Sequence, residues 1–583
     1  MATITSAGYD MSGNHNDWTL NNINETSSTL TTYDIMNDVP TLTDEDTANF
    51  CTLSPLSGGL APYNANLSIN QTAASWAATP STFTLNTGKW YFESGSSAVS
   101  AYNFHGLGLR PVGMVASVEY CGSLSGSYGC IVGPTVINLY SGGVLTASLS
   151  GTYTSSSVFQ CAVDFDAGKI WFGDGTSWVG GGNPSTGTTP SYTFTANTPL
   201  VPYISAYVSA PSVNFGQRSF KYTPPTGYKK LNTYNLPDST IQDGSQYFET
   251  TTYTGDGTNN RTIPLGFTPD MVWMKPRNYA YYHNIMDSLR DNLLLNTNTT
   301  SADFDASSIG WSNTNVTTDG FIIDAGSNAT LNGSGVNSVA WAWRGSDSSA
   351  VSNTDGTITS TVSANTDSGF SVVSYTGNST NGATIGHGLG VAPKIVIVKN
   401  RDGGWQWIVD ISNITGTTSD HLLLNSTAAK NSSNTYFSAK PTSTVFSVNG
   451  ASYSDTGTSP YKYIAYCFAD VEGFSKFGSY TGNGSADGPF IYTGFDVKFL
   501  LYKNVDAAIS WVIYDNVRDP NGNPQSYYLL PNSSGAEGTT PDAVDFLSNG
   551  FKIRYANASI NTNGQTHIYM AFAENPFKNS LAR

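Results

Sequence analysis

The stretch Ile395-Val396-Ile397-Val398-Lys399 decides the fold class of this chain. It is a short run of β-branched residues that ends in lysine, and such runs are typical of buried β-strands. Two further stretches have the same character: Met271-Val272-Trp273-Met274-Lys275 and Phe499-Leu500-Leu501-Tyr502-Lys503. Gly, Asn, Asp and Pro punctuate the chain between runs of this kind, as tight turns between strands require. We therefore expect an all-β chain, a multidomain series of β-sandwiches.

The three lysine-ended strands lie within three copies of one longer pattern. Each copy opens with Tyr-Thr-Gly and closes on an aromatic residue; the opening tyrosines are Tyr253, Tyr375 and Tyr480, and the closing residues are Trp343, Phe468 and Phe572. These landmarks lie 122–125 residues apart between the first two copies and 104–105 apart between the last two. Copies of about 100 residues are large enough to fold alone. We expect three tandem β-sandwich repeats, at residues 246–345, 369–472 and 473–583.

Two polar segments lie outside these repeats. Residues 346–368 are rich in Ser, Thr, Asn and Asp without an apolar pattern, which predicts a linker. Residues 1–59 are polar and rich in turn-forming residues, and we expect a docking segment that orders only on its particle. The first ten residues lack the basic and apolar regions of a secretory signal, and no run approaches eighteen apolar residues. We expect no membrane insertion.

The composition argues for an ordered, acidic chain and against a nucleic-acid partner. The chain has 583 residues, a length that suggests about four domains. Lys and Arg number 26 against 42 Asp and Glu, which gives a net charge of −16. This acidic balance argues against a nucleic-acid-binding surface, which needs clustered cations. Aromatic residues make up 13% of the chain and supply enough apolar area for ordered cores.

The five cysteines are too few for a disulfide scaffold. Their number is odd, so at least one is unpaired or pairs between chains. We interpret them as small buried hydrophobic residues, although Cys121 and Cys130 flank a turn and a hairpin disulfide between them is geometrically possible.

The sequence offers no catalytic constellation. It lacks His-Glu-x-x-His, Gly-x-Ser-x-Gly, Cys-x-x-Cys and phosphate-loop patterns. Asp287, Asp410 and Asp515 recur once per repeat near the lysine, and we interpret each Lys/Asp pair as a structural ion pair or a turn cap. Glycoside hydrolysis needs two carboxylates in one site, and only one recurs. We expect no enzyme activity, no catalytic residue, no cofactor and no metal site.

Four residues are candidates for ligand binding. Tryptophan rings can stack on sugar faces, and asparagine can hydrogen-bond to hydroxyl groups. Trp405 and Trp407 alternate beside the Gly403-Gly404 turn, while Trp178 and Asn183 flank a glycine-rich loop. The alternative for each tryptophan is core packing, which is the ordinary place of a large apolar ring.

The first part of the chain carries several motifs in a fixed order. They are Gly88-Lys89-Trp90-Tyr91-Phe92-Glu93, Val163-Asp164-Phe165-Asp166-Ala167-Gly168-Lys169-Ile170-Trp171-Phe172, Pro199-Leu200-Val201-Pro202 and Val213-Asn214-Phe215-Gly216-Gln217. In order and spacing they resemble the motifs of SPRY domains. The resemblance implies a concanavalin-like jelly roll at residues 60–232.

The tandem repeats carry a second resemblance. Their motifs include Gly388-Leu389-Gly390-Val391-Ala392-Pro393-Lys394, Tyr480-Thr481-Gly482-Asn483-Gly484 and Glu574-Asn575-Pro576-Phe577. These resemble an uncharacterised repeat in virion proteins of marine tailed bacteriophages, including phages of cyanobacteria and pelagic bacteria, where it often follows a SPRY domain. The first repeat departs most, with Gly266-Phe267-Thr268-Pro269 at the glycine-rich turn. The resemblance implies a virion structural protein and carries no assigned chemistry.

Three functions remain open at this point. We expect a tail fibre or tail-associated adhesin, a homotrimer on the outer surface of a virion assembled in the host cytoplasm. It would contact other virion proteins and bind a host-surface polysaccharide or receptor multivalently, since linked weak sites gain apparent affinity. The alternative is a head fibre, capsid decoration or structural connector whose β modules dock other virion proteins. The third is a polysaccharide hydrolase.

Overall fold

The computed structural model describes residues 42–579, except for residues 57–58, 98, 101, 113–118, 312–315, 327–329, 347, 451–454 and 520–521. Most of the expected docking segment, residues 1–59, lies outside the described residues. The chain divides between Asp238 and Ser239 into two compact units, called unit 1 and unit 2 here. Strands dominate both units, and the α-helices α1 (Ser412–Thr415) and α2 (Ala558–Asn561) have four residues each. The expected all-β class is confirmed.

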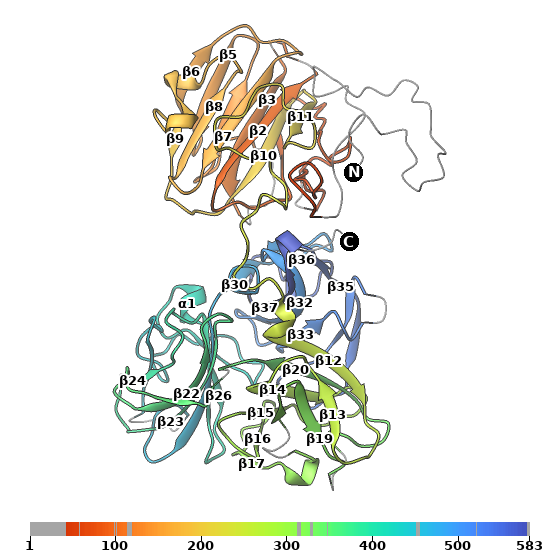
Figure 1. Cartoon of the computed structure of the whole chain (residues 1–583), viewed down its shortest axis with the longest axis vertical. Helices are drawn as coiled ribbons and strands as arrows, with labels where there is room; N and C mark the ends of the chain where they lie inside the picture. Colours follow the sequence, from red (N-terminus) through yellow and green to blue (C-terminus); the bar gives the residue numbers. More distant parts are fainter. Residues whose placement is uncertain are drawn as a thin grey trace. The chain divides into compact units, whose positions relative to one another are not determined.

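Unit 1 is a sandwich of two antiparallel sheets (Figure 1). The first sheet has the order β1 (Ala77–Pro80), β10 (Leu200–Tyr207), β3 (Phe104–Pro111), β4 (Tyr128–Val132), β5 (Val136–Ser141) and β6 (Val144–Ser150). The second has the order β11 (Pro211–Asn214), β2 (Lys89–Ser96), β7 (Val158–Asp164), β8 (Lys169–Gly173) and β9 (Tyr192–Thr193). This is the layered architecture that the SPRY resemblance implies.

The interior of unit 1 lies between these sheets. His105 of β3 meets Phe159 of β7 across it, with ring centroids 5.2 Å apart. Burial lowers the pKa of His105 to about 4, so the ring is neutral. All five cysteines of the chain are buried and free, Cys121 and Cys130 included. The interpretation of the cysteines as buried hydrophobic residues is confirmed.

Unit 2 contains the three repeats, each with two antiparallel sheets. We call the first sheet given below for each repeat its larger sheet, although both sheets of repeat 3 have four strands. Repeat 1 has the sheets β12 (Phe248–Thr254), β20 (Asn337–Trp343), β14 (Met271–Pro276), β15 (Asn284–Asp287), β16 (Leu293–Asn296), β17 (Phe304–Asp305) and β13 (Arg261–Pro264), β19 (Gly320–Ile323), β18 (Val316–Thr317). Repeat 2 has the sheets β21 (Val351–Asn353), β22 (Ser360–Asn365), β23 (Phe370–Thr376), β29 (Lys462–Phe468), β25 (Ile395–Asn400), β26 (Trp407–Asp410), β27 (His421–Leu423) and β24 (Ala383–Gly386), β28 (Val445–Val448). Repeat 3 has the sheets β30 (Ser475–Thr481), β37 (Thr566–Pro576), β32 (Phe495–Asn504), β33 (Val512–Asp515) and β31 (Phe490–Tyr492), β36 (Gly550–Ile553), β35 (Gly538–Leu547), β34 (Gln525–Tyr528).

The strand ladders confirm the repeat pattern. The same three strands run side by side in each larger sheet: opening strand, closing strand and lysine-ended strand. The closing aromatic residues hold one register position, since Trp343 lies opposite Met271, Phe468 opposite Ile395 and Phe572 opposite Phe499. Each of these partners lies four residues before the lysine of its strand.

The expected linker at residues 346–368 is instead part of repeat 2. Strands β21 and β22 extend the larger sheet, with Val362 opposite Val373 of β23. Ile358 and Val362 are buried in the core of repeat 2. The apolar residues that anchor this segment are few and stand among exposed polar ones, so the sequence pattern was too sparse to indicate a strand.

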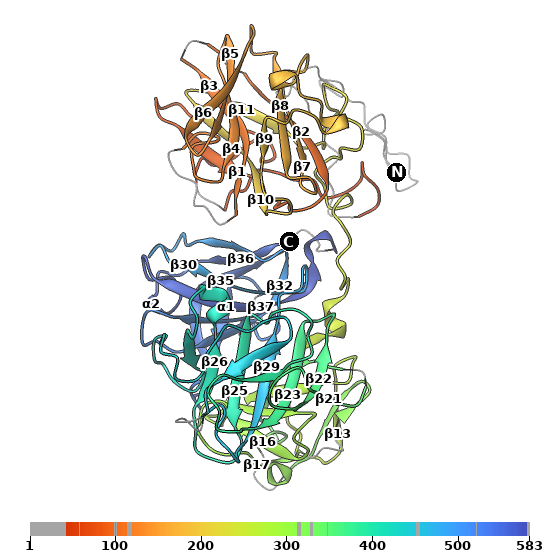
Figure 2. The same ribbon diagram turned by 90° about the vertical axis from the view of Figure 1, so that its left-hand side faces the viewer.

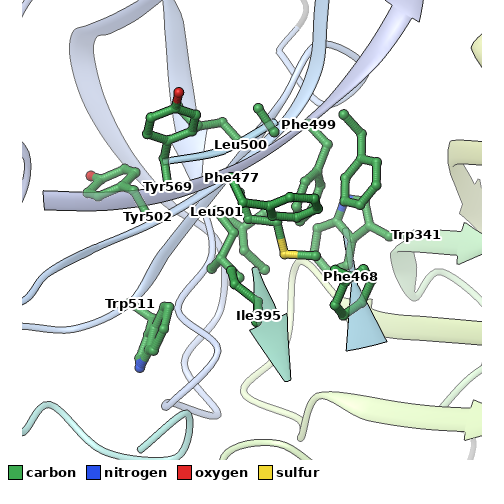
Figure 3. Packing of buried hydrophobic residues seen from close by; sticks show 14 of the residues in the cluster. Trp341, Ile395, Phe468, Phe477, Phe499, Leu500, Leu501, Tyr502, Trp511 and Tyr569 are labelled. Carbon is green, nitrogen blue, oxygen red and sulfur yellow. The ribbon is translucent and has the colours of Figure 1, made fainter. Parts of the chain in front are cut away.

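The three larger sheets meet at one shared core. The aromatic residues that close the repeats, Trp343, Phe468 and Phe572, form a triangle with ring centroids 6.2, 5.7 and 6.2 Å apart. Figure 3 shows Trp341, Phe468 and Phe499, one from each repeat, packed around the same space. The void left there is about 10 Å³, the lower limit for one water molecule. Figures 1 and 2 both show the three repeats in contact within unit 2.

This arrangement explains why the lysine-ended strands are apolar on both faces. In β25, Val396 and Val398 lie in the core of repeat 2, whereas Ile395 and Ile397 lie in the core shared by all repeats. A strand buried on both faces lacks the alternation of apolar and polar residues that a half-exposed strand shows. We expected repeats that fold alone, but each larger sheet has a face that only its neighbours cover.

The lysine at the end of each of these strands is a turn cap. The Nζ atoms of Lys275, Lys399 and Lys503 each donate to the carbonyl of the next residue at 2.6 Å. Each Nζ also donates to a carbonyl four residues on, at 3.0–3.3 Å. Burial lowers the pKa of each lysine to about 8.

The recurrent aspartates pair with arginine rather than with these lysines. Asp287 Oδ2 lies 2.6 Å from Arg290 Nε, and Asp515 Oδ2 lies 2.5 Å from Arg518 Nε, with all four side chains buried. A neighbouring repeat completes each pair, because Tyr466 Oη donates to Asp287 (2.6 Å) and Trp341 Nε1 donates to Asp515 (3.0 Å). These two hydrogen bonds join repeat 1 to repeat 2 and repeat 3 to repeat 1.

Asp410 is not the equivalent of Asp287 and Asp515. Asp287 and Asp515 lie opposite Met271 and Phe499, but Asp410 lies opposite Val396, one position further along its ladder. Its side chain therefore lies on the other face of the sheet. Ile411 lies in the shared core in its place. The aspartate follows the lysine by 12 positions in repeats 1 and 3 but by 11 in repeat 2, and this difference of one residue moves Asp410 to the other face.

Candidate functional site

A cleft of about 270 Å³ opens on the surface of unit 1. Its lining comes from strand β7, the turn after β8, the 3-10 helix Pro184–Thr186 and a segment near residue 222. The lining residues are Gln160, Gly175, Thr176, Ser177, Trp178, Asn183, Pro184, Ser185, Tyr222, Thr223 and Pro225. None of these side chains carries a charge. Two of the four candidate ligand-binding residues, Trp178 and Asn183, are therefore brought together here.

The turn that forms one wall of the cleft is held by Asp174. Its Oδ1 accepts hydrogen bonds from the backbone nitrogens of Thr176 (2.9 Å) and Ser177 (2.8 Å). Partial burial opposes ionisation of Asp174, but the hydrogen bonds from this turn prevail and lower its pKa. Asp174 therefore stays an anion that fixes the turn beside Trp178.

Gly175 lets the ring of Tyr222 pack against this turn. Its φ is +89°, a left-handed conformation that favours glycine. A Cβ atom there would lie only 2.0 Å from Tyr222 Cζ. Any larger residue at this position therefore displaces an aromatic ring of the cleft.

A buried hydrogen-bond chain supports the floor of the cleft. Gln160 Oε1 accepts from Gly175 N (3.1 Å), and its Nε2 donates to Tyr91 Oη (2.8 Å), which donates to Glu93 Oε1 (2.8 Å). Glu93 also accepts from the backbone nitrogens of Lys221 and Tyr222, both at 2.9 Å. Burial raises the pKa of Glu93 despite these donors. Glu93 thus fastens the segment that carries Tyr222.

Asn183 and Trp178 are positioned by local structure. Asn183 caps the 3-10 helix Pro184–Thr186, since its side chain accepts from Thr186 N at 3.3 Å. Trp178 is half-buried against the cluster that includes Tyr91, Trp171 and Tyr228. The cleft thus offers fixed aromatic surface beside hydroxyl and amide groups, a combination suited to a neutral, polyhydroxylated ligand.

Sequence reasoning missed Gln160 and the segment that carries Tyr222. Gln160 lies 18 residues before Trp178, and Tyr222, Thr223 and Pro225 lie 44–47 residues after it, so only the fold places them together. Tyr222 belongs to none of the motifs quoted for the SPRY resemblance. A survey of all aromatic residues, rather than of tryptophans, would have included it.

A known protein family matches the part of the chain that forms unit 2. The model of a family described as a domain of unknown function, DUF7483, matches residues 243–576, more than half of the chain. The chain belongs to the DUF7483 family. The matched residues span all three repeats, as unit 2 does. Among curated proteins, none matches the chain significantly.

Two solved structures similar to the chain are SPRY domains. The crystal structure of the TRIM65 PSpry domain is 16% identical, with a TM-score of 0.22; the match covers 28% of this chain and 90% of that chain. The crystal structure of the SPRY domain of human HERC1 is 13% identical, with a TM-score of 0.23, and covers 29% of this chain and 99% of that chain.

The other two candidate residues lie in the DUF7483 domain and do not share a site. Trp407 is 0% exposed and belongs to the shared core, where its Nε1 donates to the carbonyl of Asn296 in repeat 1 at 3.0 Å. The prediction that Trp407 contacts a ligand is therefore wrong, because its side chain faces a neighbouring sheet. Trp405 is half-buried and packs on Tyr461, with ring centroids 6.5 Å apart.

The described residues show neither a metal-ligand cluster nor a spanning helix. Between residues 42 and 579, apart from the gaps given above, His, Cys, Asp and Glu side chains form no group of three that is able to hold a metal ion. In the same part of the chain no helix has the length and apolarity needed to cross a membrane.

Proposed function

We propose that this chain is a bacteriophage virion structural protein, a tail fibre or tail-associated adhesin on the outer surface of the particle. The resemblance of its repeats to those of marine tailed-phage virion proteins supports the setting. In this proposal the chain binds a host-surface glycan without cleaving it, as a homotrimer that also contacts other virion proteins. The observation that carries the binding function is the uncharged cleft with Trp178 and Tyr222 on its walls.

The chemistry of the cleft favours binding over hydrolysis. Its lining contains no carboxylate, whereas glycoside hydrolysis needs an acid and a second carboxylate within about 10 Å. A shallow site of this kind supports an affinity near millimolar, about −4 kcal/mol. Several copies on one particle raise the apparent affinity by roughly 10²–10⁴.

Substitution of Trp178 by alanine tests this function. We expect the full chain to bind neutral polysaccharides on an array of bacterial surface glycans, and the Trp178→Ala variant to bind about tenfold more weakly. Because the cleft carries no charge, binding should change little between 0.05 and 0.5 M salt. Trp76→Ala, which removes a half-buried tryptophan of unit 1 that does not line the cleft, is the matched control. Equal binding by Trp178→Ala and wild-type protein would contradict the assignment.

One observation favours the alternative of a head fibre, capsid decoration or connector. Strand β6 is the edge of its sheet, most of its residues are exposed, and Val144 and Leu145 are exposed apolar residues on it. Such an edge can add a strand from another protein. Binding to purified virion proteins but to no glycan, with loss on Leu145→Pro, would support this alternative.

A further inference from the structure

The turn between β14 and β15 exposes three tyrosines within four residues. Tyr279, Tyr281 and Tyr282 have relative exposures of 46%, 37% and 52%. The rings of Tyr279 and Tyr281 are stacked, with centroids 5.6 Å apart and planes 28° apart. We call residues 277–283 the tyrosine loop. Single exposed tyrosines also occur elsewhere, at Tyr102 and Tyr234 for example, but three exposed tyrosines within four residues form a contiguous aromatic patch, which is informative.

The backbone of the tyrosine loop is fixed beneath these rings. The carbonyl of Tyr279 accepts from Lys275 Nζ (3.3 Å) and from Tyr281 N (2.9 Å), and that of Tyr282 accepts from Asn284 Nδ2 (3.0 Å). Asn278 ties the loop to the start of β20, donating to Gly335 O (2.9 Å) and accepting from Asn337 N (3.0 Å). A ligand would therefore meet rings whose supporting backbone is already ordered, which reduces the entropy lost on binding.

The other two repeats show that the fold does not require these tyrosines. Lys399 and Lys503 cap the equivalent turns by the same contacts. In repeat 2 that turn carries Gly403, Gly404 and the half-buried Trp405, and in repeat 3 it carries Ala507, Ala508 and Ile509. Packing alone therefore does not account for exposed aromatic rings in repeat 1.

The charges of the loop are already satisfied. Arg277 contacts Glu537 of repeat 3 through Nε (3.0 Å to both carboxylate oxygens) and Nη2 (2.7 Å). Burial lowers the pKa of His283 well below its usual range, so this ring is neutral. The exposed part of the loop therefore presents apolar ring faces and phenol hydroxyls, without a charge to attract an ion.

We propose that the tyrosine loop is a second glycan-binding site, one that takes a neutral pyranose. The C–H face of the sugar stacks on the outer faces of Tyr281 or Tyr279, while the tyrosine hydroxyls bond to its hydroxyl groups. This inference rests on the proposed function, since it places a further carbohydrate site on the same adhesin. It assigns a binding role to unit 2 that the cleft of unit 1 does not supply.

The test compares full-length variants on an array of purified neutral bacterial polysaccharides. The variants are the double substitution Tyr279→Ala with Tyr281→Ala, Tyr281→Phe, Trp178→Ala and Tyr555→Ala. We expect the double variant to lose about tenfold in affinity for at least one polysaccharide, measured by calorimetric titration. Tyr281→Phe keeps the stacking face and should retain most of the affinity. Tyr555→Ala, which removes a lone exposed tyrosine outside both sites, should behave as wild type.

Each outcome separates the two sites. If the double variant loses polysaccharide binding while Trp178→Ala retains it, the tyrosine loop is a binding site and the cleft is not. If both variants lose binding, both sites are supported. Unchanged binding by the double variant overturns the tyrosine loop and leaves the proposed function standing if Trp178→Ala loses binding. A wild-type chain that binds no polysaccharide overturns both. If light scattering shows that the tyrosines mediate self-association and glycan binding is unchanged, the loop is a protein contact.

Discussion

The three recurrent aspartates differ in how their buried charge is compensated. Asp287 and Asp515 each have an arginine and a donor from a neighbouring repeat, so their charges are compensated. Asp410 is 1% exposed, and its Oδ1 accepts from Ser412 N at 2.8 Å. Among the described residues its Oδ2 has no hydrogen-bond partner. Burial raises the pKa of Asp410 to about 6.

This carboxyl predicts a pH-dependent stability. Between pH 4 and 6 the folded chain holds a proton that the unfolded chain has released, so stability falls as the pH rises through this window. Asp410→Asn mimics the protonated form at every pH. We expect the variant to match wild type near pH 4 and to exceed it by about 3 kcal/mol in free energy of unfolding above pH 7. Urea unfolding at the two pH values measures this.

Asp515→Asn is the matched control. Asp515 is equally buried, but its removal leaves Arg518 without its nearest partner. Arg518 keeps Glu537 as a second partner, at 2.7 Å, so we expect a loss of about 2–3 kcal/mol at both pH values. If Asp410→Asn were also destabilising at pH 7, the buried carboxyl would have a partner that compensates its charge.

Single positions also show where sequence reasoning stops. The positions of the lysines and closing aromatics were predictable because spacing and residue type agree in all three copies. The place of Asp410 was not, because a one-residue shift reverses the face without altering the pattern. Trp178 and Asn183 were found through their side chains, whereas Tyr222 needed the fold. Alternation placed Trp407 on a face, but it gave no sign that a neighbouring sheet covers that face.

Strands β21 and β22 show that a few buried apolar residues can suffice to hold a strand on a sheet. Val362→Ala removes buried methyl groups from the core of repeat 2 and should destabilise unit 2 by about 2 kcal/mol. Thr361 is the adjacent exposed residue on the same strand, so Thr361→Ala should change stability by less than about 0.5 kcal/mol. Chemical denaturation followed by tryptophan fluorescence compares them. Two neutral substitutions would return this segment to the role of a linker.

Because the three repeats share a core, we expect unit 2 to behave as one folding unit. Each larger sheet needs its neighbours to cover one face, so a single repeat would expose residues such as Ile395 and Trp407. This explains why three recognisable copies do not amount to three independent domains. The sequence showed the copies but not the contacts between them, since those contacts alternate within strands that are apolar throughout.

Calorimetry tests this unity. We expect residues 239–579 to unfold in one cooperative transition, and residues 346–472 alone to show none. Trp343→Ala, at the junction of the three sheets, should lower the free energy of unfolding of the whole unit by about 3–5 kcal/mol. The exposed Tyr282→Ala serves as the control and should leave the transition in place. Three separable transitions would show that the shared core contributes little.

Covalent linkage of the three copies has an evolutionary consequence. In a symmetric trimer of identical chains, any codon change appears at all three equivalent positions. A patch such as the tyrosine loop would then be present three times, even where one copy is sufficient. Here the triangle of Trp343, Phe468 and Phe572 is encoded by three separate codons, and a tryptophan already occupies one corner. Three copies within one chain thus allow each copy its own surface while the centre keeps all three together.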